Sequence, residues 1–218
     1  MREERMVPIV FLPGAGGRAS FWAPVAERLR HLAPQVLVGW PGFGDEPLVP
    51  GFGSLDDLFR WLRGRLPSGP VHVVAQSMGG VVALRLALEE PGRVASLVLA
   101  ATSGGVNAAA LGGTDWRAEY RAELPNVPDW FERDVTDLTD RLHLISAPTL
   151  ILYGDADPIC PQAIAELLER RIGSARVVRV HGGTHTFAQE RPGEVALAIE
   201  AHLTSLAAGG PRATRLGS

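Results

Sequence analysis

Residues 71–80 read VHVVAQSMGG, an apolar stretch that runs directly into a serine flanked by small residues. The stretch predicts a buried strand that turns abruptly into a helix. Such a turn strains its central residue and is tolerated only when the neighbours two positions away lack bulk, as Ala75 and Gly79 do. The turn would lift the hydroxyl of Ser77 clear of the sheet and aim the backbone N–H of Met78 at the same point. Ser77 is therefore the candidate nucleophile, and an ordinary helix N-cap is the alternative for this serine.

Two later predicted strands are each followed by candidate catalytic side chains. The first is followed by two acids, Asp155 and Asp157, and the second by two histidines, His181 and His185. In open α/β sheets ligands bind outside the carboxyl ends of the strands, so these side chains are expected on the same rim as Ser77. Along the chain these candidates occur in the order Ser, Asp, His. In such a set a histidine can take the serine proton while a carboxylate fixes the tautomer of the histidine. Asp155 and Asp157 compete for the role of the acid, and His181 and His185 compete for the role of the base.

With these motifs the chain resembles the α/β-hydrolase superfamily from about residue 7 to residue 206, and small bacterial carboxylesterases in particular. The PGFG loop at residues 41–44 is part of this resemblance. By position, the resemblance implies a nucleophile at Ser77, an acid at Asp157 and a base at His185. It further implies carboxylic-ester hydrolysis without a metal or an organic cofactor.

The resemblance also implies an oxyanion hole made of two backbone N–H groups. One is that of Met78, and the other comes from the loop after an early strand, residues 12–17 (LPGAGG), where it falls on Ala15. The chain departs from the family pattern at three positions: Pro13 replaces a histidine, and Ala75 and Thr184 replace glycines. The change to Pro13 matters little for a donor that acts through its backbone, and Ala75 and Thr184 are both small residues.

The same loop satisfies a dinucleotide-binding pattern, because residues 14–19 read GAGGRA between a predicted strand and a predicted helix. A nicotinamide-dependent enzyme usually has an acid at the end of the next strand to bind the ribose, and here that end reads Gly39-Trp40-Pro41. The sequence therefore favours the hydrolase over an oxidoreductase.

Length and composition predict one globular domain. The chain has 218 residues, of which 46% are hydrophobic, and its net charge of −3 offers no basic surface for nucleic acid. The lone cysteine, Cys160, excludes an internal disulfide and is given no catalytic role. No secretory or membrane-spanning pattern is found, so we expect a cytoplasmic protein that does not bind membranes. The other histidines are expected to be structural or solvated: His31, His72, His143 and His202.

Short apolar runs alternate with amphipathic stretches, which predicts an α/β fold with one doubly wound, mostly parallel sheet of six strands that lacks the family's N-terminal hairpin. Strands are expected at 7–12, 35–40, 71–75, 94–100, 149–153 and 176–180. Helices are expected at 21–31, 55–66, 78–89, 161–170 and 192–206. The domain would span residues 1–206, followed by a disordered tail at residues 207–218.

Residues 101–148 are too many for a simple connection between strands, and we call them the insertion. The resemblance implies that the insertion is a short helical lid over the serine. Its aromatic residues are candidates for the substrate pocket, or else merely pack it onto the body: Trp116, Tyr120, Trp130 and Phe131. A solvated helix face is expected for its acids, Asp129, Glu132, Asp134, Asp137 and Asp140, and a buried face for Val135, Leu138 and Leu142.

The expected function is hydrolysis of a carboxylic ester or thioester of a small to medium acyl group through an acyl-enzyme. The substrate would be a small molecule and could be attached to a carrier. Carbon–carbon or lactone hydrolysis with the same three side chains is an alternative. A non-catalytic protein that binds a small ligand in the same pocket is an alternative of a different class.

Overall fold

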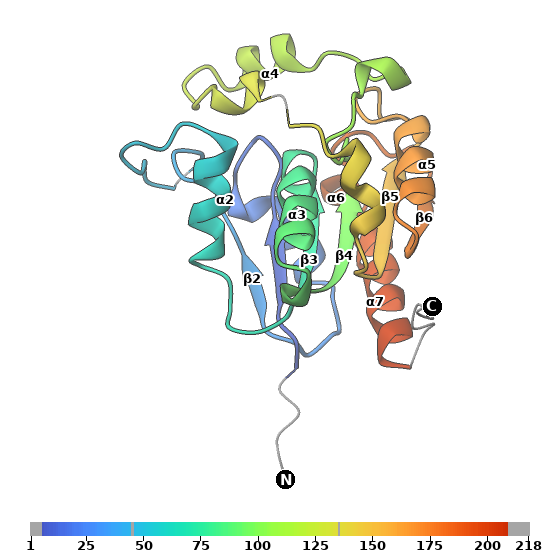
Figure 1. Cartoon of the computed structure of the whole chain (residues 1–218). Helices are drawn as coiled ribbons and strands as arrows, with labels where there is room; N and C mark the ends of the chain where they lie inside the picture. The colour runs from blue at the N-terminus through green and yellow to red at the C-terminus, as the bar shows by residue number, and fades with distance from the viewer. Residues whose placement is uncertain (1–5, 45, 135, 209–218) are drawn as a thin grey trace.

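The computed structural model describes residues 6–44, 46–134 and 136–208, which fold around a single six-stranded parallel sheet (Figure 1). The strand order is β2-β1-β3-β4-β5-β6. The strands are β1 (Ile9–Leu12), β2 (Gln35–Leu37), β3 (Val71–Gln76), β4 (Val94–Ala100), β5 (Thr149–Gly154) and β6 (Ala175–Val180). The predicted six-stranded parallel sheet is confirmed.

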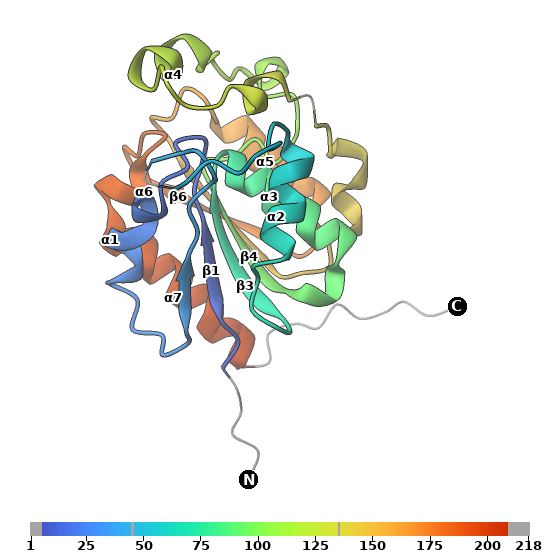
Figure 2. The same ribbon diagram turned by 90° about the vertical axis from the view of Figure 1, so that its left-hand side faces the viewer.

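Helices cover both faces of the sheet (Figure 2). One face packs against α2 (Leu55–Arg63), α3 (Met78–Glu89) and α5 (Gln162–Arg171). The other packs against the 3-10 helix η1 (Ala19–Trp22), α1 (Ala23–Ala26), α6 (Phe187–Glu190) and α7 (Pro192–Ala207). A short 3-10 helix, η2 (Pro91–Arg93), leads from α3 into β4.

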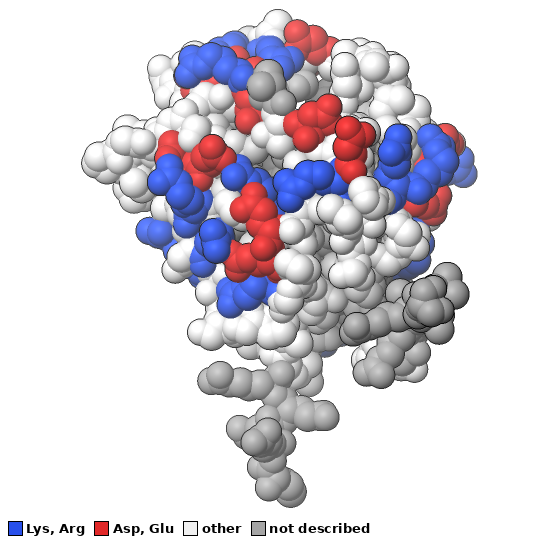
Figure 3. All heavy atoms as spheres, in the orientation of Figure 1, with Lys and Arg blue, Asp and Glu red and all other residues white. Residues whose placement is uncertain are grey.

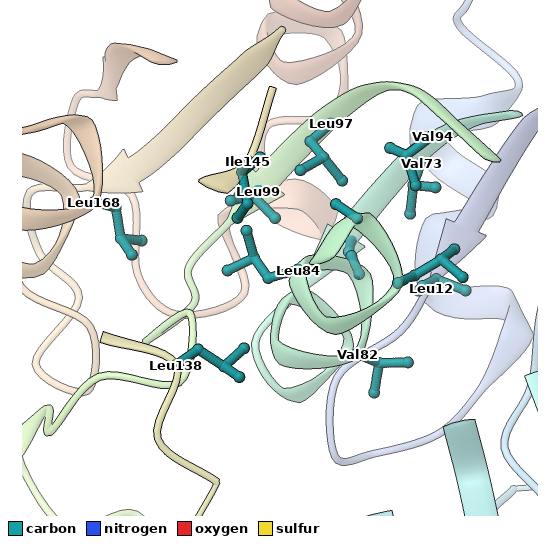
Figure 4. Packing of buried hydrophobic residues seen from close by; sticks show 14 of the residues in the cluster. Leu12, Val73, Val82, Leu84, Val94, Leu97, Leu99, Leu138, Ile145 and Leu168 are labelled. Atoms are coloured by element: carbon teal, nitrogen blue, oxygen red, sulfur yellow. The ribbon is translucent and has the colours of Figure 1, made fainter. Parts of the chain in front are cut away.

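Strands β1, β4 and β5 are almost entirely apolar because both of their faces are buried. In β1, Val10 and Leu12 contribute to the core on the α3 side, whereas Ile9 and Phe11 contribute to the core on the α7 side. Figure 4 shows that strand, helix and insertion residues share the first of these cores, among them Leu84 of α3. Leu84 is fully buried, so its truncation to alanine would cost about 2–5 kcal/mol.

The helix expected at 21–31 is wrong in extent. The segment is divided between η1 and the four-residue α1, in which Pro24 occupies the first turn. After α1 the Arg28 N–H donates to the Val25 carbonyl three residues back, and the Leu29 N–H is shared between the carbonyls of Val25 and Ala26, so the last turn tightens before β2. The strand expected at 35–40 is also shorter, ending at Leu37.

The insertion lies above the carboxyl ends of the strands, with α4 at the top of the molecule (Figure 1). Its elements are η3 (Ala109–Leu111), α4 (Arg117–Glu123), η4 (Trp130–Arg133) and η5 (Thr139–Leu144).

The prediction of a single acidic helix in the insertion is wrong, because two separate 3-10 helices, η4 and η5, are found. Asp134 and Asp137 each accept a hydrogen bond from the backbone N–H two residues on, and this local bonding competes with helix formation between η4 and η5. Leu138 and Leu142 are buried as predicted, while Val135 lies outside the described residues. Glu132 is partly buried rather than solvated and pairs with Arg121.

At the C-terminal end, α7 continues through Ala207, the first residue of the expected tail. Residues 209–218 lie outside the described ranges. None of the helices in the described part is both long and apolar enough to cross a bilayer.

Charged side chains of both signs are intermixed on the face shown in Figure 3. Arg85 of α3 illustrates this mixing, since it pairs with Asp56 and with Glu89. Its guanidinium also lies over the ring of Phe59, 4.4 Å from the centroid. Such pairs offset one another locally, in keeping with the small net charge.

Two histidines make the stability of the fold sensitive to acid. Burial lowers the pKa of His72, on β3, and of His202, on α7, to about 4 each. The positive charges of His31 and Arg176 act in the same direction. Because both imidazoles take up a proton more readily in the unfolded chain, their contribution to stability is complete above the unfolded pKa of about 6.5 and is lost as the pH falls towards 4.

We therefore expect the free energy of unfolding to fall between pH 7 and pH 5, with a contribution from His202 on the order of 1–2 kcal/mol. Urea denaturation at both pH values measures this change. His202→Gln should flatten the pH dependence of the free energy of unfolding even if it lowers stability overall. The matched control is His143→Gln, at an exposed position of η5. An unchanged slope in His202→Gln would contradict the prediction.

Candidate active site

Ser77 occupies a sharp turn between β3 and α3. Its φ of 51° and ψ of −121° lie in a region that non-glycine residues rarely adopt, and among the described non-glycine residues only Ala101 shares a positive φ. The peptide is held on both sides, because the Ser77 N–H donates to the Ala100 carbonyl at 3.0 Å and the Thr102 hydroxyl donates to the Ser77 carbonyl at 2.6 Å. The hydroxyl of Ser77 makes no capping hydrogen bond, so the N-cap alternative does not hold.

The small residues after Ser77 permit close packing. A Cβ on Gly79 would collide with the carbonyls of Leu12 and Pro13, the former at 2.9 Å. A Cβ on Gly80 would lie 2.7 Å from that of Thr102. The turn can therefore approach both the end of β1 and the end of β4 only because these positions lack side chains.

The three side chains singled out from the sequence meet in one chain of hydrogen bonds. The Oγ of Ser77 lies 3.0 Å from Nε2 of His185, and Nδ1 of His185 lies 2.9 Å from Oδ2 of Asp157. Both distances are within hydrogen-bonding range. His185 can thus accept the serine proton on one nitrogen while the other faces a carboxylate.

The carboxylate of Asp157 is fixed from its other side. It is only 4% exposed, and Oδ1 accepts the backbone N–H groups of Ile159 at 2.8 Å and Cys160 at 3.0 Å. These bonds satisfy one oxygen and leave Oδ2 for His185. The turn after β5 therefore presents a desolvated, oriented acceptor to the imidazole.

The competing acid and histidine pair with each other instead. Nδ1 of His181 lies 2.8 Å from Oδ2 of Asp155, and this hydrogen bond is the main cause that lowers the pKa of Asp155. The His181 side chain is 85% exposed. Strand β6 ends at Val180, directly before His181, and the Asp155–His181 pair lies at the surface without reaching Ser77.

Residues 181–186, between β6 and α6, form the loop that we call the His185 loop, and several residues that hold it were missed from the sequence. The amide of Gln76 donates to the His185 carbonyl at 3.2 Å. The carboxylate of Glu190 accepts the hydroxyls of Thr184 and Thr186, which flank the histidine. The only sequence signal was a polar side chain, Gln76, at the end of an apolar strand.

Residues 12–17, which are the last residue of β1 and the loop that follows it, lie beside Ser77, and we call this segment the β1 loop. Ala15 and Met78 line the same cleft as Ser77. Met78 begins α3, so its N–H has no acceptor within the helix. The β1 loop leads into the four-residue η1 rather than into a long helix whose N-terminus could bind a pyrophosphate, which further disfavours the dinucleotide pattern.

The cleft at this site has a volume of about 1190 Å³ and lies between the β1 loop, the His185 loop and the insertion. Three of the four aromatic candidates line it: Trp116, Tyr120 and Phe131. The rings of Trp116 and Phe131 stack with centroids 5.4 Å apart, and Tyr120 meets Phe131 edge-on at 5.1 Å. These rings form an apolar roof on the insertion side.

Trp130 is a correction to the predicted pocket. It does not line the cleft but is buried, with its ring against those of Phe43 at 6.2 Å and Phe52 at 5.8 Å. Residues of the main body occupy the side of η4 to which this ring points. Trp130 therefore attaches the insertion to the body.

Asp157, Cys160 and His185 could be taken for metal ligands, because their ligating atoms lie within 4.8 Å of one another. The donor set does not fit a metal well. The oxygens of Asp157 are already engaged in hydrogen bonds, and burial raises the pKa of the Cys160 thiol well above its ordinary value. A protonated thiol is a poor ligand, so this cluster fits proton transfer better than metal binding.

The chain is similar to several named esterases. A pimeloyl-[acyl-carrier protein] methyl ester esterase from Aeromonas salmonicida (strain A449) is 28% identical over 81% of this chain and 87% of that protein. The protein of the same name from Legionella pneumophila (strain Lens) is 23% identical over 82% of this chain and 87% of that protein. The solved structure of a thermophilic esterase from Thermogutta terrifontis shares the fold, with a TM-score of 0.73 and 21% identity over 92% of this chain and 90% of that chain.

Family models match the chain along nearly its whole length. One, described as TAP-like protein, matches residues 119–207. Another, described as alpha/beta hydrolase fold, matches residues 7–147, which is more than half of the sequence. The sheet order, the strained serine and this match agree, and the chain belongs to the alpha/beta hydrolase fold family.

Proposed function

We propose that this chain is a serine hydrolase that cleaves a carboxylic ester or thioester of a small to medium acyl group through an acyl-enzyme. The observation that carries the proposal is the continuous hydrogen-bonded path from Ser77 through His185 to the buried Asp157. The names of the relatives, which describe esterases, support the same reaction class.

In the proposed mechanism, His185 takes the Ser77 proton as Oγ attacks the carbonyl carbon of the substrate. Asp157 keeps the imidazole in the tautomer that can accept this proton and stabilises the imidazolium that results. The N–H groups of Met78 and Ala15 stabilise the negative charge that develops on the carbonyl oxygen. Protonated His185 then gives its proton to the leaving alcohol or thiol. A water molecule, activated by the same histidine, releases the acid.

The insertion is proposed to shape the acyl pocket. A volume of about 1190 Å³ leaves room for a medium acyl group together with part of its leaving group. The stacked rings of Trp116 and Phe131 offer an apolar wall, and apolar surface is what an acyl chain buries favourably. A carrier-bound methyl ester, the substrate named for two relatives, is one member of this class.

Ser77→Ala should reduce turnover of p-nitrophenyl butyrate by about 10³-fold or more, because the three side chains act as a unit. A fluorophosphonate probe should label the wild-type chain covalently and fail to label the variant. Ser20→Ala is the matched control, since Ser20 lines the same cleft. Wild-type turnover in Ser77→Ala would refute the mechanism, and absence of labelling in the folded wild type would favour a non-catalytic binding protein.

The two acid–histidine pairs give a second test. Asp157→Asn should lower kcat by about 10³- to 10⁴-fold, because the amide favours the wrong imidazole tautomer. Asp155→Asn should leave kcat within about twofold, since exposed ion pairs contribute little. Steady-state kinetics of both variants, with urea denaturation to compare their stability, makes the comparison. Equal losses in the two variants would argue against Asp157 as the acid.

A further inference from the structure

The β1 loop is held by three aromatic donors from three different elements. The indole N–H of Trp22, in η1, donates to the Leu12 carbonyl at 2.9 Å. That of Trp40, which follows β2, donates to the Gly14 carbonyl at 2.9 Å. The hydroxyl of Tyr120, in α4, donates to the Ala15 carbonyl at 2.8 Å.

Only one of these bonds acts on the peptide unit that carries the proposed oxyanion donor. The Gly14 carbonyl and the Ala15 N–H belong to the same peptide, and no peptide among the described residues is cis. In a planar trans peptide the C=O and N–H bonds point in opposite directions. The direction in which Trp40 holds the Gly14 carbonyl therefore determines the direction in which the Ala15 N–H points.

The attachment of Trp40 to the β1 loop is built into the core. Its side chain is 0% exposed, and its own backbone N–H donates to the Gly17 carbonyl at 2.8 Å. The Gly14 carbonyl also accepts the Gly17 N–H at 3.0 Å, which closes a tight turn behind the peptide. Trp40 does not line the cleft, so it reaches the reaction only through the backbone it holds.

We propose that Trp40 is a positioning residue whose buried indole N–H orients the Gly14–Ala15 peptide so that the Ala15 N–H stabilises the oxyanion. This inference rests on the proposed function and adds a residue that the reaction requires without contact to substrate. An oxyanion donor acts when charge develops on the carbonyl oxygen in the transition state. Loss of the Trp40 hydrogen bond should therefore lower kcat and leave KM largely unchanged.

Trp40→Phe is the test variant, because phenylalanine keeps an aromatic ring in the core and removes the N–H. We expect kcat on p-nitrophenyl butyrate to fall about 10- to 100-fold with KM within about twofold, less than the loss of a whole oxyanion donor. Affinity for a trifluoromethyl ketone should fall by a similar factor. This inhibitor forms a bond from Ser77 Oγ to its carbonyl carbon, with the proton passing to His185 and the negative charge to the ketone oxygen.

Trp22→Phe is a matched control. Trp22 is equally buried, and its indole bonds to the same loop at the same distance. The Leu12 carbonyl, however, belongs to a peptide whose nitrogen is that of Pro13, which has no N–H to orient. Trp22→Phe should therefore leave kcat and inhibitor affinity within about threefold of wild type, even if both variants lose similar thermal stability.

Equal losses of kcat in the two variants, or a Trp40→Phe effect confined to KM or to the melting temperature, would overturn the proposal. If Trp40→Phe does not fold, site-specific incorporation of β-(3-benzothienyl)alanine at position 40 replaces it, since that side chain keeps the indole shape with sulfur in place of N–H. Ser77→Ala distinguishes a failure of the proposed function from a failure of this inference. Wild-type turnover in Ser77→Ala refutes the proposed function, whereas an inactive Ser77→Ala beside a fully active Trp40→Phe refutes this inference alone.

Discussion

The left-handed backbone of Ser77 is the constraint on which the arrangement of the site depends. Such a conformation costs about 1–3 kcal/mol and persists only when the surroundings determine it. Here β4 and the residues that follow it do so, since Ala100 supplies a carbonyl to the Ser77 N–H and the Thr102 hydroxyl donates to the Ser77 carbonyl. The strain is thus offset by the hydrogen bonds and burial of the sheet centre.

The same constraint organises the neighbouring loops. Because Gly79 lacks a side chain, α3 packs directly on the carbonyls at the end of β1, and the β1 loop comes to lie beside the serine. The turns after β5 and β6 then supply the acid and the histidine from the same edge of the sheet, as parallel topology requires. Three segments distant in sequence meet because each follows a parallel strand.

The sheet and its central strands could be predicted from the sequence because burial on both faces leaves a nearly continuous apolar signal, clearest in residues 9–12. The position of Ser77 at the end of β3 followed from the small residues around it. Which acid faces His185 could not be derived from spacing, since Asp155 and Asp157 are separated by one residue. The resemblance distinguished them, and the turn after β5 buries only Asp157.

The insertion was predicted less well for physical reasons. Its aspartates compete for backbone N–H groups in ways that a helical periodicity does not register, so one expected helix became two short 3-10 turns. The direction of each aromatic ring depended on contacts with distant segments, as with Trp130 against Phe43 and Phe52. The indole hydrogen bonds of Trp22 and Trp40 could not be predicted either, because their acceptors are backbone carbonyls, which every residue carries.

The two border strands of the sheet have a consequence for how copies of this chain meet in solution. Within the described residues the sheet ends at β2 on one side and at β6 on the other, and each border carries backbone groups that a foreign strand could pair with. β2 offers only three residues, and β6 exposes Arg176 and Arg179. A short border and a charged border both disfavour strand-to-strand aggregation at the margins of these six strands.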